Sequence, residues 1–382
     1  MRITAKIIPA LLVAAVLAVA TAAQLPARDF SRLESVMNQA VTEGVFPGAS
    51  LAVLYKGKVV FHRAFGRLTY DPKSAPADTT TIYDAASLTK AIVTTSIVMQ
   101  LSERDSLDIH APVARYRPGF AAAGKDRVTV EQLMRHDSGL RAHTFFSATC
   151  RTPEEIFRTI EKDSLSYPTG TKTLYSDLGF IMLGRIVETL TGNTLPANFH
   201  NRFSAPLAMR STMFNPPAEL LGRIAPTEPD AKWPLVTPRP LVNDQNAAIL
   251  GGAAGHAGLF TTTGDLATMV KMLISGGSYE GRSYIRPATV RMFLKKTASS
   301  RAIGWDMVTP GGSSSAGTRF SGSSWGHLGY TGTSIWVDPE KELAVILLSN
   351  RVWPSSENIR IRKFRPLLHD TVVECIETDT GH

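Results

Sequence analysis

The stretch Ala85-Ala86-Ser87-Leu88-Thr89-Lys90 decides how the rest of the sequence is interpreted. Ser87 stands where an apolar helix over residues 87–101 is expected to begin, and a spacing of three places Lys90 on the same helical face. A serine hydroxyl becomes a useful nucleophile when a neighbour takes its proton, and a lysine whose pKa is lowered can do so. The simpler interpretation, a serine N-cap followed by a surface lysine, holds unless other motifs accompany this one.

Two further motifs follow in a fixed order. Tyr175-Ser176-Asp177 opens the next strongly amphipathic helix, expected over residues 175–190, and His327-Leu328-Gly329 enters a β-rich segment. S-x-x-K followed by S-D-N and K-T-G is the signature of β-lactamases and penicillin-binding proteins, and the three motifs here follow the same order. These three sites together outweigh the N-cap interpretation of Ser87.

The sequence therefore resembles the serine β-lactamase and DD-peptidase (penicillin-binding protein) superfamily. It is most similar to the class C-like branch of β-lactamase-related serine hydrolases and esterases, in which the second motif is Y-x-N and the third can be H-x-G. The resemblance covers residues 30–375 in order. The segments that carry it around the motifs are residues 128–140, 175–184, 251–266 and 326–350.

The resemblance implies a role for each motif residue. Ser87 would be the acylated nucleophile, and Lys90 would be its hydrogen-bonded base or base partner. Tyr175 would carry the proton to the leaving group, which requires its pKa to be depressed by Lys90. The oxyanion hole would consist of the backbone N–H groups of Ser87 and Tyr330. The remaining substrate-binding residues would be Asp177, His327 and Gly329, and no metal or cofactor is required.

Two departures from the family pattern bear on the substrate. Asp177 stands where asparagine is usual, and an ionised carboxylate accepts hydrogen bonds but cannot donate them. His327-Leu328 stands where Lys-Thr, which recognises the carboxylate of a β-lactam, is common. Histidine is mostly neutral at pH 7 and leucine donates nothing. We therefore expect a hydrolase of amides or esters, carboxylesterase-like or DD-peptidase-like, with β-lactamase activity as the alternative.

The order of predicted elements favours an α+β fold. Strands do not alternate with helices, so a parallel sheet is not expected. We predict one antiparallel sheet built from both ends of the chain, flanked by N- and C-terminal helices, with an inserted all-helical subdomain. The prediction is a single catalytic domain over residues 30–376, with a sheet part at 30–70 and 300–376 and a helical part at 80–295. The predicted strands are 49–55, 59–65, 302–308, 333–337 and 343–350, and the predicted terminal helices are 30–44 and 359–376.

Composition limits the remaining classes of protein. The 382 residues are 43% hydrophobic, which supports a large core, and two cysteines exclude a disulfide-stapled scaffold and a four-cysteine metal site. Residues 1–22 resemble a cleaved signal peptide, the alternative being an uncleaved anchor, so a periplasmic or secreted protein is expected. Loss of Arg2 and Lys6 lowers the net charge from +8 to +6. We expect no nucleic-acid binding from this charge, and at most peripheral contact with the anionic cell envelope.

Several features stay open at this point. Cys150 and Cys375 either pair or remain separate thiols. His136 fits a turn that ends a helix, and His256 is either structural or at the cleft rim. Gly322–Gly326 matches G-x-S-x-G but lacks the helix that a nucleophile elbow needs. The basic run Arg360, Arg362, Lys363 and Arg365 fits the solvated face of the last helix. A non-hydrolytic penicillin-binding or sensor module is a further alternative, the substrate is a small molecule or peptidoglycan-derived, and the oligomeric state is undetermined.

Overall fold

The computed structural model describes residues 28–229, 241–296, 301–309 and 314–378. The predicted signal peptide, residues 1–22, lies outside these ranges. No helix within them has both the length and the apolar character that crossing a membrane requires.

A six-stranded antiparallel sheet is the centre of the described fold, with strand order β2-β1-β11-β10-β9-β8. The N-terminal hairpin joins the C-terminal strands because β1 pairs with β11, where Ala49 lies opposite Ser349 and Tyr55 opposite Leu343. This confirms an antiparallel sheet built from both ends of the chain. The strands are β1 (Gly48–Tyr55), β2 (Lys58–Gly66), β8 (Asp306–Met307), β9 (Trp325–Leu328), β10 (Ser334–Asp338) and β11 (Leu343–Ser349).

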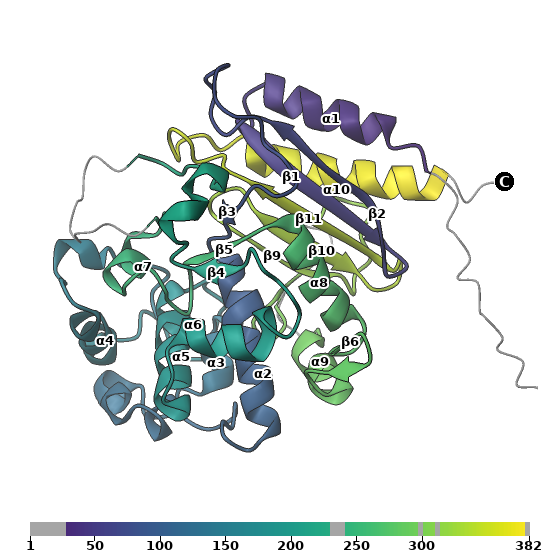
Figure 1. The fold of residues 1–382 in the computed structure, drawn as a ribbon. Helices are drawn as coiled ribbons and strands as arrows, with labels where there is room; N and C mark the ends of the chain where they lie inside the picture. The colour runs from purple at the N-terminus through teal and green to yellow at the C-terminus, as the bar shows by residue number, and fades with distance from the viewer. Residues whose placement is uncertain (1–27, 230–240, 297–300, 310–313, 379–382) are drawn as a thin grey trace, which may run out of the picture.

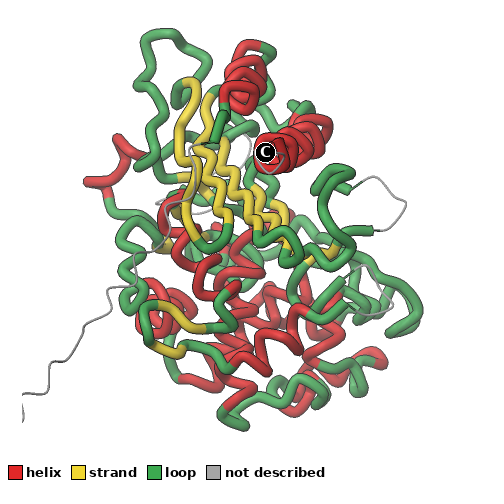
Figure 2. The backbone as a smooth tube through the Cα atoms, turned by 90° about the vertical axis from the view of Figure 1, so that its right-hand side faces the viewer, coloured by secondary structure: helices red, strands yellow, loops and turns green. Residues whose placement is uncertain are grey.

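The terminal helices α1 (Ser31–Thr42) and α10 (Ile361–Glu377) lie side by side on one face of this sheet (Figures 1 and 2). Side chains alternate between the two faces of a strand. Leu51 and Val53 of β1 therefore join the core under the two helices, while Ala52 and Leu54 join the core on the opposite face. The apolar run at residues 51–54 is explained by burial on both faces of the sheet.

The middle of the chain forms the second half of the molecule, below the sheet in Figure 1. It is mostly helical, as predicted, but not all-helical. It also carries a three-stranded sheet, β3 (Tyr83–Asp84), β5 (Leu259–Thr261) and β4 (Met213–Phe214), and the hairpin β6 (Ser278–Tyr279) with β7 (Arg282–Ser283). Strands this short show no alternation in a sequence. The helices are η1 (Lys90–Thr95), α2 (Ser96–Glu103), η2 (Val113–Arg115), η3 (Pro118–Gly124), α3 (Val130–Arg135), η4 (Phe146–Ala148), α4 (Pro153–Lys162), α5 (Asp177–Thr191), α6 (Leu195–Phe199), η5 (His200–Ser204), η6 (Ala218–Arg223), α7 (Gln245–Ile249), α8 (Thr263–Ile274) and α9 (Pro287–Leu294).

The fold settles two of the open features and corrects one predicted strand. Cys150 and Cys375 are free, buried thiols that lie in two different hydrophobic cores. Ser324, the serine of the G-x-S-x-G match, is buried directly before β9, so no nucleophile elbow forms there. The strand predicted over residues 302–308 is reduced to β8. Gly304 interrupts it with φ +78°, where an added Cβ would lie 2.1 Å from Thr95 Oγ1.

Candidate active site

A strained turn presents Ser87. Ala86 has φ +47°, a conformation that is costly for a residue with a side chain. The turn is held by the buried carboxylate of Asp84, which accepts hydrogen bonds from the Ala86 N–H (2.7 Å) and the Asn243 N–H (2.7 Å). Burial raises the pKa of Asp84 to about 6, although these two hydrogen bonds lower it. Ser87 therefore stands at the entrance of the helix on a turn that other segments keep in place.

Lys90 is fully buried and touches Ser87. Its Nζ donates to Ser87 Oγ (2.9 Å) and to the carbonyl of His256 (3.1 Å), and it forms an ion pair with Asp177 Oδ1 (2.7 Å). A buried ammonium group needs such partners because burial alone would favour its neutral form. The helical spacing that predicted a contact between Ser87 and Lys90 is confirmed by this geometry.

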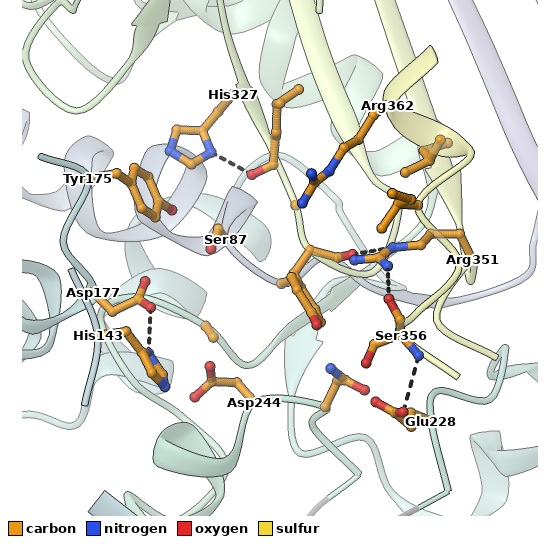
Figure 3. Close-up of a pocket in the computed structure, with 18 of the residues that line it drawn as sticks. Ser87, His143, Tyr175, Asp177, Glu228, Asp244, His327, Arg351, Ser356 and Arg362 are labelled. Atoms are coloured by element: carbon orange, nitrogen blue, oxygen red, sulfur yellow. Dashed lines mark hydrogen bonds and ion pairs between the residues drawn. The ribbon is translucent and has the colours of Figure 1, made fainter. Parts of the chain in front are cut away.

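Asp177 connects Lys90 to a histidine that the motifs did not reveal. The second carboxylate oxygen of Asp177 lies 3.1 Å from His143 Nδ1 (Figure 3). Burial raises the pKa of Asp177, but the Lys90 ammonium and the His143 hydrogen bond lower it by more, so the carboxyl is ionised. The hydrogen bond to Asp177 in turn raises the pKa of His143, against burial.

The expectation that Lys90 and Tyr175 have lowered pKa values is wrong. Burial lowers the pKa of Lys90, but the Asp177 carboxylate and Tyr175 raise it by more, so the net pKa is raised. Burial also raises the pKa of Tyr175, and the nearby ammonium offsets only part of this effect. The Lys90 Nζ lies 5.0 Å from the centroid of the Tyr175 ring. The resting site is therefore a charged Lys90–Asp177 pair beside a neutral phenol.

His136 orients the second motif. It ends α3 with φ +60°, as the turn interpretation predicted, and its ring is buried 4.5 Å from the Tyr175 ring. Its Nδ1 accepts a hydrogen bond from the Ser176 N–H at 3.0 Å, so the ring must be neutral. Burial holds the pKa of His136 well below its usual range. This histidine therefore fixes the backbone between Tyr175 and Asp177.

His327 is a neutral histidine in the cavity wall. It lies on β9, is 3% exposed, and its Nδ1 donates to the carbonyl of Leu328 at 2.8 Å. Burial, Lys90 and Arg301 lower its pKa to about 3. Among the described residues nothing hydrogen-bonds its Nε2, which is left with a free lone pair.

The loop after β9 lies against the serine turn. Gly329 has to be glycine there, because an added Cβ would lie 2.6 Å from the Ala85 carbonyl oxygen. Two hydroxyls join the segments: Thr331 Oγ1 donates to the Asp84 carbonyl (2.7 Å) and Thr333 Oγ1 to the Ala85 carbonyl (3.0 Å). Within the described ranges, no backbone carbonyl accepts from the N–H of Ser87 or of Tyr330. Both amides are therefore free to donate to a ligand.

Two arginines from the C-terminal end of the chain support the same loop. Arg365 Nη2 donates to the carbonyls of Gly329 (3.0 Å) and Thr333 (2.8 Å), and Arg351 Nε donates to the carbonyl of Tyr330 (2.8 Å). Burial lowers the pKa of Arg365 to about 9. The interpretation of the basic run as a solvated face is therefore wrong for Arg365, which is 6% exposed.

His256 is structural and does not form the cleft rim. It is 1% exposed, its Nε2 lies 2.9 Å from Asp244 Oδ1, and its carbonyl accepts from Lys90. Burial raises the pKa of Asp244, but His256 lowers it by more, so this carboxyl has a lowered pKa. Sequence reasoning missed Asp244, as it missed His143, because neither lies in a recognised motif.

These residues surround a cavity of about 750 Å³ at the seam between the two halves of the molecule (Figure 3). Its lining carries charges of both signs: the carboxylates of Asp177, Asp244 and Glu228, and several arginines, of which Arg301 lies over the Tyr175 ring and Arg351 beside Tyr330. Within the described residues no three His, Cys, Asp or Glu side chains gather as a metal site. The predicted residues that line the cavity together are Ser87, Tyr175, Asp177, His327, Gly329 and Tyr330, with Lys90 buried behind Ser87.

Comparison with known proteins agrees with this site. A family model described as Beta-lactamase matches residues 33–366. An N-acetylmuramyl-L-alanine amidase of Bacillus subtilis (strain 168) is 31% identical and covers 87% of this chain and 83% of the relative. A protein of Escherichia coli (strain K12), provisionally named a D-alanyl-D-alanine carboxypeptidase, is 29% identical and covers 84% of this chain and 82% of the relative.

A solved structure supports the fold independently. The crystal structure of a penicillin-binding protein homologue from Caulobacter crescentus superposes with a TM-score of 0.71 at 20% identity, covering 91% of this chain and 97% of that one. The family resemblance inferred from the three motifs and the α+β fold are both confirmed. This chain belongs to the Beta-lactamase family and is a serine hydrolase of that family.

Proposed function

We propose that the protein cleaves an amide or ester through an acyl-enzyme on Ser87. The observation that carries this proposal is the fully buried Lys90 ammonium 2.9 Å from Ser87 Oγ, at the wall of a cavity large enough for a small ligand. A nucleophile within hydrogen-bonding reach of a group that a third residue orients is the arrangement of covalent catalysis. Asp177 is that third residue.

The Lys90–Asp177 pair supplies the base in this proposal. The ion pair is stable while water reaches it, but entry of a substrate removes water and favours a neutral pair. A proton then crosses the 2.7 Å from Lys90 Nζ to Asp177, which leaves a free amine. That amine takes the Ser87 proton as Oγ forms its bond to the carbonyl carbon.

The rest of the cycle follows from the same groups. The carbonyl oxygen becomes an oxyanion that accepts from the free N–H groups of Ser87 and Tyr330. When the bond to the leaving group breaks, Tyr175 passes the proton from Lys90 to the departing nitrogen or oxygen. Water then attacks the acyl-Ser87 ester and gives a proton to the same base. The bond between the acyl carbon and Ser87 Oγ breaks, Oγ takes that proton back, and the acid leaves.

The substrate class follows from the cavity and from the relatives. The names of the two relatives refer to amide bonds of peptidoglycan, which favours a peptidoglycan-derived substrate here. Exposed Arg362 lines the cavity (Figure 3) and forms no ion pair with any described carboxylate, so it can bind an anionic substrate group. His327, held neutral, does not provide the cation that a β-lactam carboxylate usually finds on this strand. We therefore expect slow nitrocefin turnover compared with a dedicated resistance enzyme.

Intact-mass spectrometry tests the proposal directly. The purified protein is mixed in parallel with penicillin, a p-nitrophenyl ester and a D-Ala-D-Ala peptide, and the mass of the protein and the product are followed. We expect transient acylation that maps to Ser87 and turnover of the ester or the peptide. A fluorophosphonate probe should label the wild type and leave Ser87→Ala unlabelled.

The alternatives predict different masses. A penicillin-binding or sensor module would remain a stable acyl-serine without turnover, and a β-lactamase would release opened penicillin at high rate. Equal labelling of wild type and Ser87→Ala would contradict the nucleophile assignment, with Ser324→Ala as a matched control at a buried serine outside the cavity.

We also propose a periplasmic or secreted location. The basic start and apolar run of residues 1–22, and the peptidoglycan-related names of the relatives, support it. The N-terminal sequence of the protein recovered from its source, starting near residue 23, would agree with cleavage, and an intact Met1 would contradict it.

A further inference from the structure

A second hollow of about 320 Å³ lies in the helical half and shares no lining residue with the catalytic cavity. Three arginines line it from three separate elements: Arg104 ends α2, Arg202 lies on η5, and Arg282 begins β7. The other lining groups are neutral amides, a serine and a tyrosine, and no carboxylate is among them. The hollow is therefore polar and positively charged.

Arg202 is held in one orientation by two buried amides. Its Nε donates to Asn198 Oδ1 (3.3 Å) and its Nη1 to Gln100 Oε1 (3.2 Å). The amide nitrogens of both residues are used elsewhere, since Asn198 Nδ2 donates to Thr191 Oγ1 and Gln100 Nε2 to the carbonyl of Tyr284. Asn198 and Gln100 are 3% and 7% exposed, so the guanidinium is built into the fold while its Nη2 stays available.

The other two arginines complete a cationic rim. The Arg282 guanidinium lies over the Tyr284 ring, 5.1 Å from its centroid, which limits its movement. In the described part of the chain, none of the three arginines has a carboxylate within ion-pair distance. Burial lowers the pKa of Arg202, and the positive charge of Arg104 lowers it further. Repulsion between like charges without a counterion is unfavourable, and a bound anion would reduce it.

We propose that this hollow is an anion-binding site for a phosphate group, free or carried on a sugar. Three guanidinium groups suit the several oxygens of phosphate, because each offers N–H donors in a fixed planar fork. The volume accommodates a phosphate with an attached sugar ring but not a folded partner.

Isothermal titration calorimetry with inorganic phosphate tests the site, at constant ionic strength maintained with sodium chloride. Arg202→Gln should weaken phosphate binding by about tenfold or more, since one charge-assisted hydrogen-bonding group is lost. The double variant Arg104→Gln/Arg282→Gln should weaken it similarly. Both of those residues are exposed, so this variant decides the question even if Arg202→Gln does not fold. Arg127→Gln, an exposed arginine in the same half and outside the hollow, is the matched control and should bind like the wild type.

The same titration separates the two sources of phosphate. Tighter binding of glucose 1-phosphate than of inorganic phosphate would support a phosphorylated sugar, and equal binding would support the free anion. Wild-type binding no stronger than that of the double variant would overturn the proposal. So would an equal loss of binding in Arg127→Gln.

Discussion

The two faces of the central sheet are packed by different interactions. Under α1 and α10 the buried side chains form an apolar cluster that includes Leu33, Leu347 and Val372, although α10 also buries Arg365 and His369. At the seam on the other side, the buried set includes Lys90, which pairs with Asp177, and His256, which shares a hydrogen bond with Asp244. Apolar burial is non-directional and proportional to area, whereas a buried charge is tolerated only with its partner. The first region should therefore respond to changes in volume, and the second to the loss of a single partner.

The largest effect is expected for Lys90→Met, which keeps the length of the side chain and removes its charge. Ser87 loses its proton acceptor and Asp177 is left unpaired, so kcat/KM should fall by about 10³-fold or more and unfolding free energy by about 3 kcal/mol. Steady-state kinetics and urea unfolding measure the two losses. Lys125→Met is the matched control: Lys125 is also fully buried, but its Nζ donates to the carbonyls of Ala122 and Asp163 away from the cavity. The Lys125→Met variant should lose stability and keep its activity. A loss of activity as large as that of Lys90→Met would contradict the catalytic role of Lys90.

In the apolar region, Leu347→Ala should lower the unfolding free energy by about 2–5 kcal/mol, because it leaves a cavity under the terminal helices. The activity of each folded molecule should stay at the wild-type value. Denaturant unfolding together with active-site titration by a fluorophosphonate probe separates the two quantities. A lowered kcat at full folding would show that the two faces are coupled.

The variant Asp177→Asn preserves the side-chain volume at the seam. It should change the pH dependence of kcat/KM more than it changes the fold. Burial still lowers the pKa of Lys90, but the carboxylate that raised it is gone. The acidic limb of kcat/KM should therefore move to lower pH. Because the pKa of Asp177 is lowered in the folded protein, its contribution to stability is present above 3.8 and is lost as pH falls. The stability gap between wild type and variant should consequently shrink below about pH 4, and a constant gap would contradict the ion pair.

The smallest effect is expected for His143→Gln. The Asp177 hydrogen bond raises the pKa of His143, so its contribution to stability is fully present below 6.5 and is lost as pH rises through the folded-state value. The side chain is one-third exposed, so the loss should stay below about 1 kcal/mol. Melting temperatures should differ most near pH 5.5 and converge above about pH 8. A difference in melting temperature that grows with pH would contradict the raised pKa of His143.

The apolar region was largely predictable from sequence. The helix predicted over residues 30–44 corresponds to α1, and the strands predicted over residues 49–55 and 59–65 correspond to β1 and β2. Periodicity carries this information because each residue only has to face a core. The motif residues were predictable too, since Ser87, Tyr175 and His327 lie in recognisable patterns at the cavity wall.

What the sequence did not provide was the identity of the partners. His143 contacts Asp177 and Asp244 contacts His256, and neither His143 nor Asp244 lies in a recognisable local motif. The pKa of Lys90 was predicted in the wrong direction because S-x-x-K names the lysine but not the carboxylate beside it. Arg365 was assigned to a solvated face because charge patterning does not show which arginine turns toward a carbonyl.

Arg365 has a consequence for the order of events during synthesis. The carbonyls it binds, those of Gly329 and Thr333, belong to the loop that carries the free Tyr330 amide, and Arg365 itself lies on α10, the last helix of the described chain. Strand β1 likewise cannot pair with β11 until β11 has been synthesised. A partly made chain can therefore contain Ser87, Lys90 and Tyr175 and still lack the loop geometry. Assembly of this site therefore requires that α10 has already been synthesised.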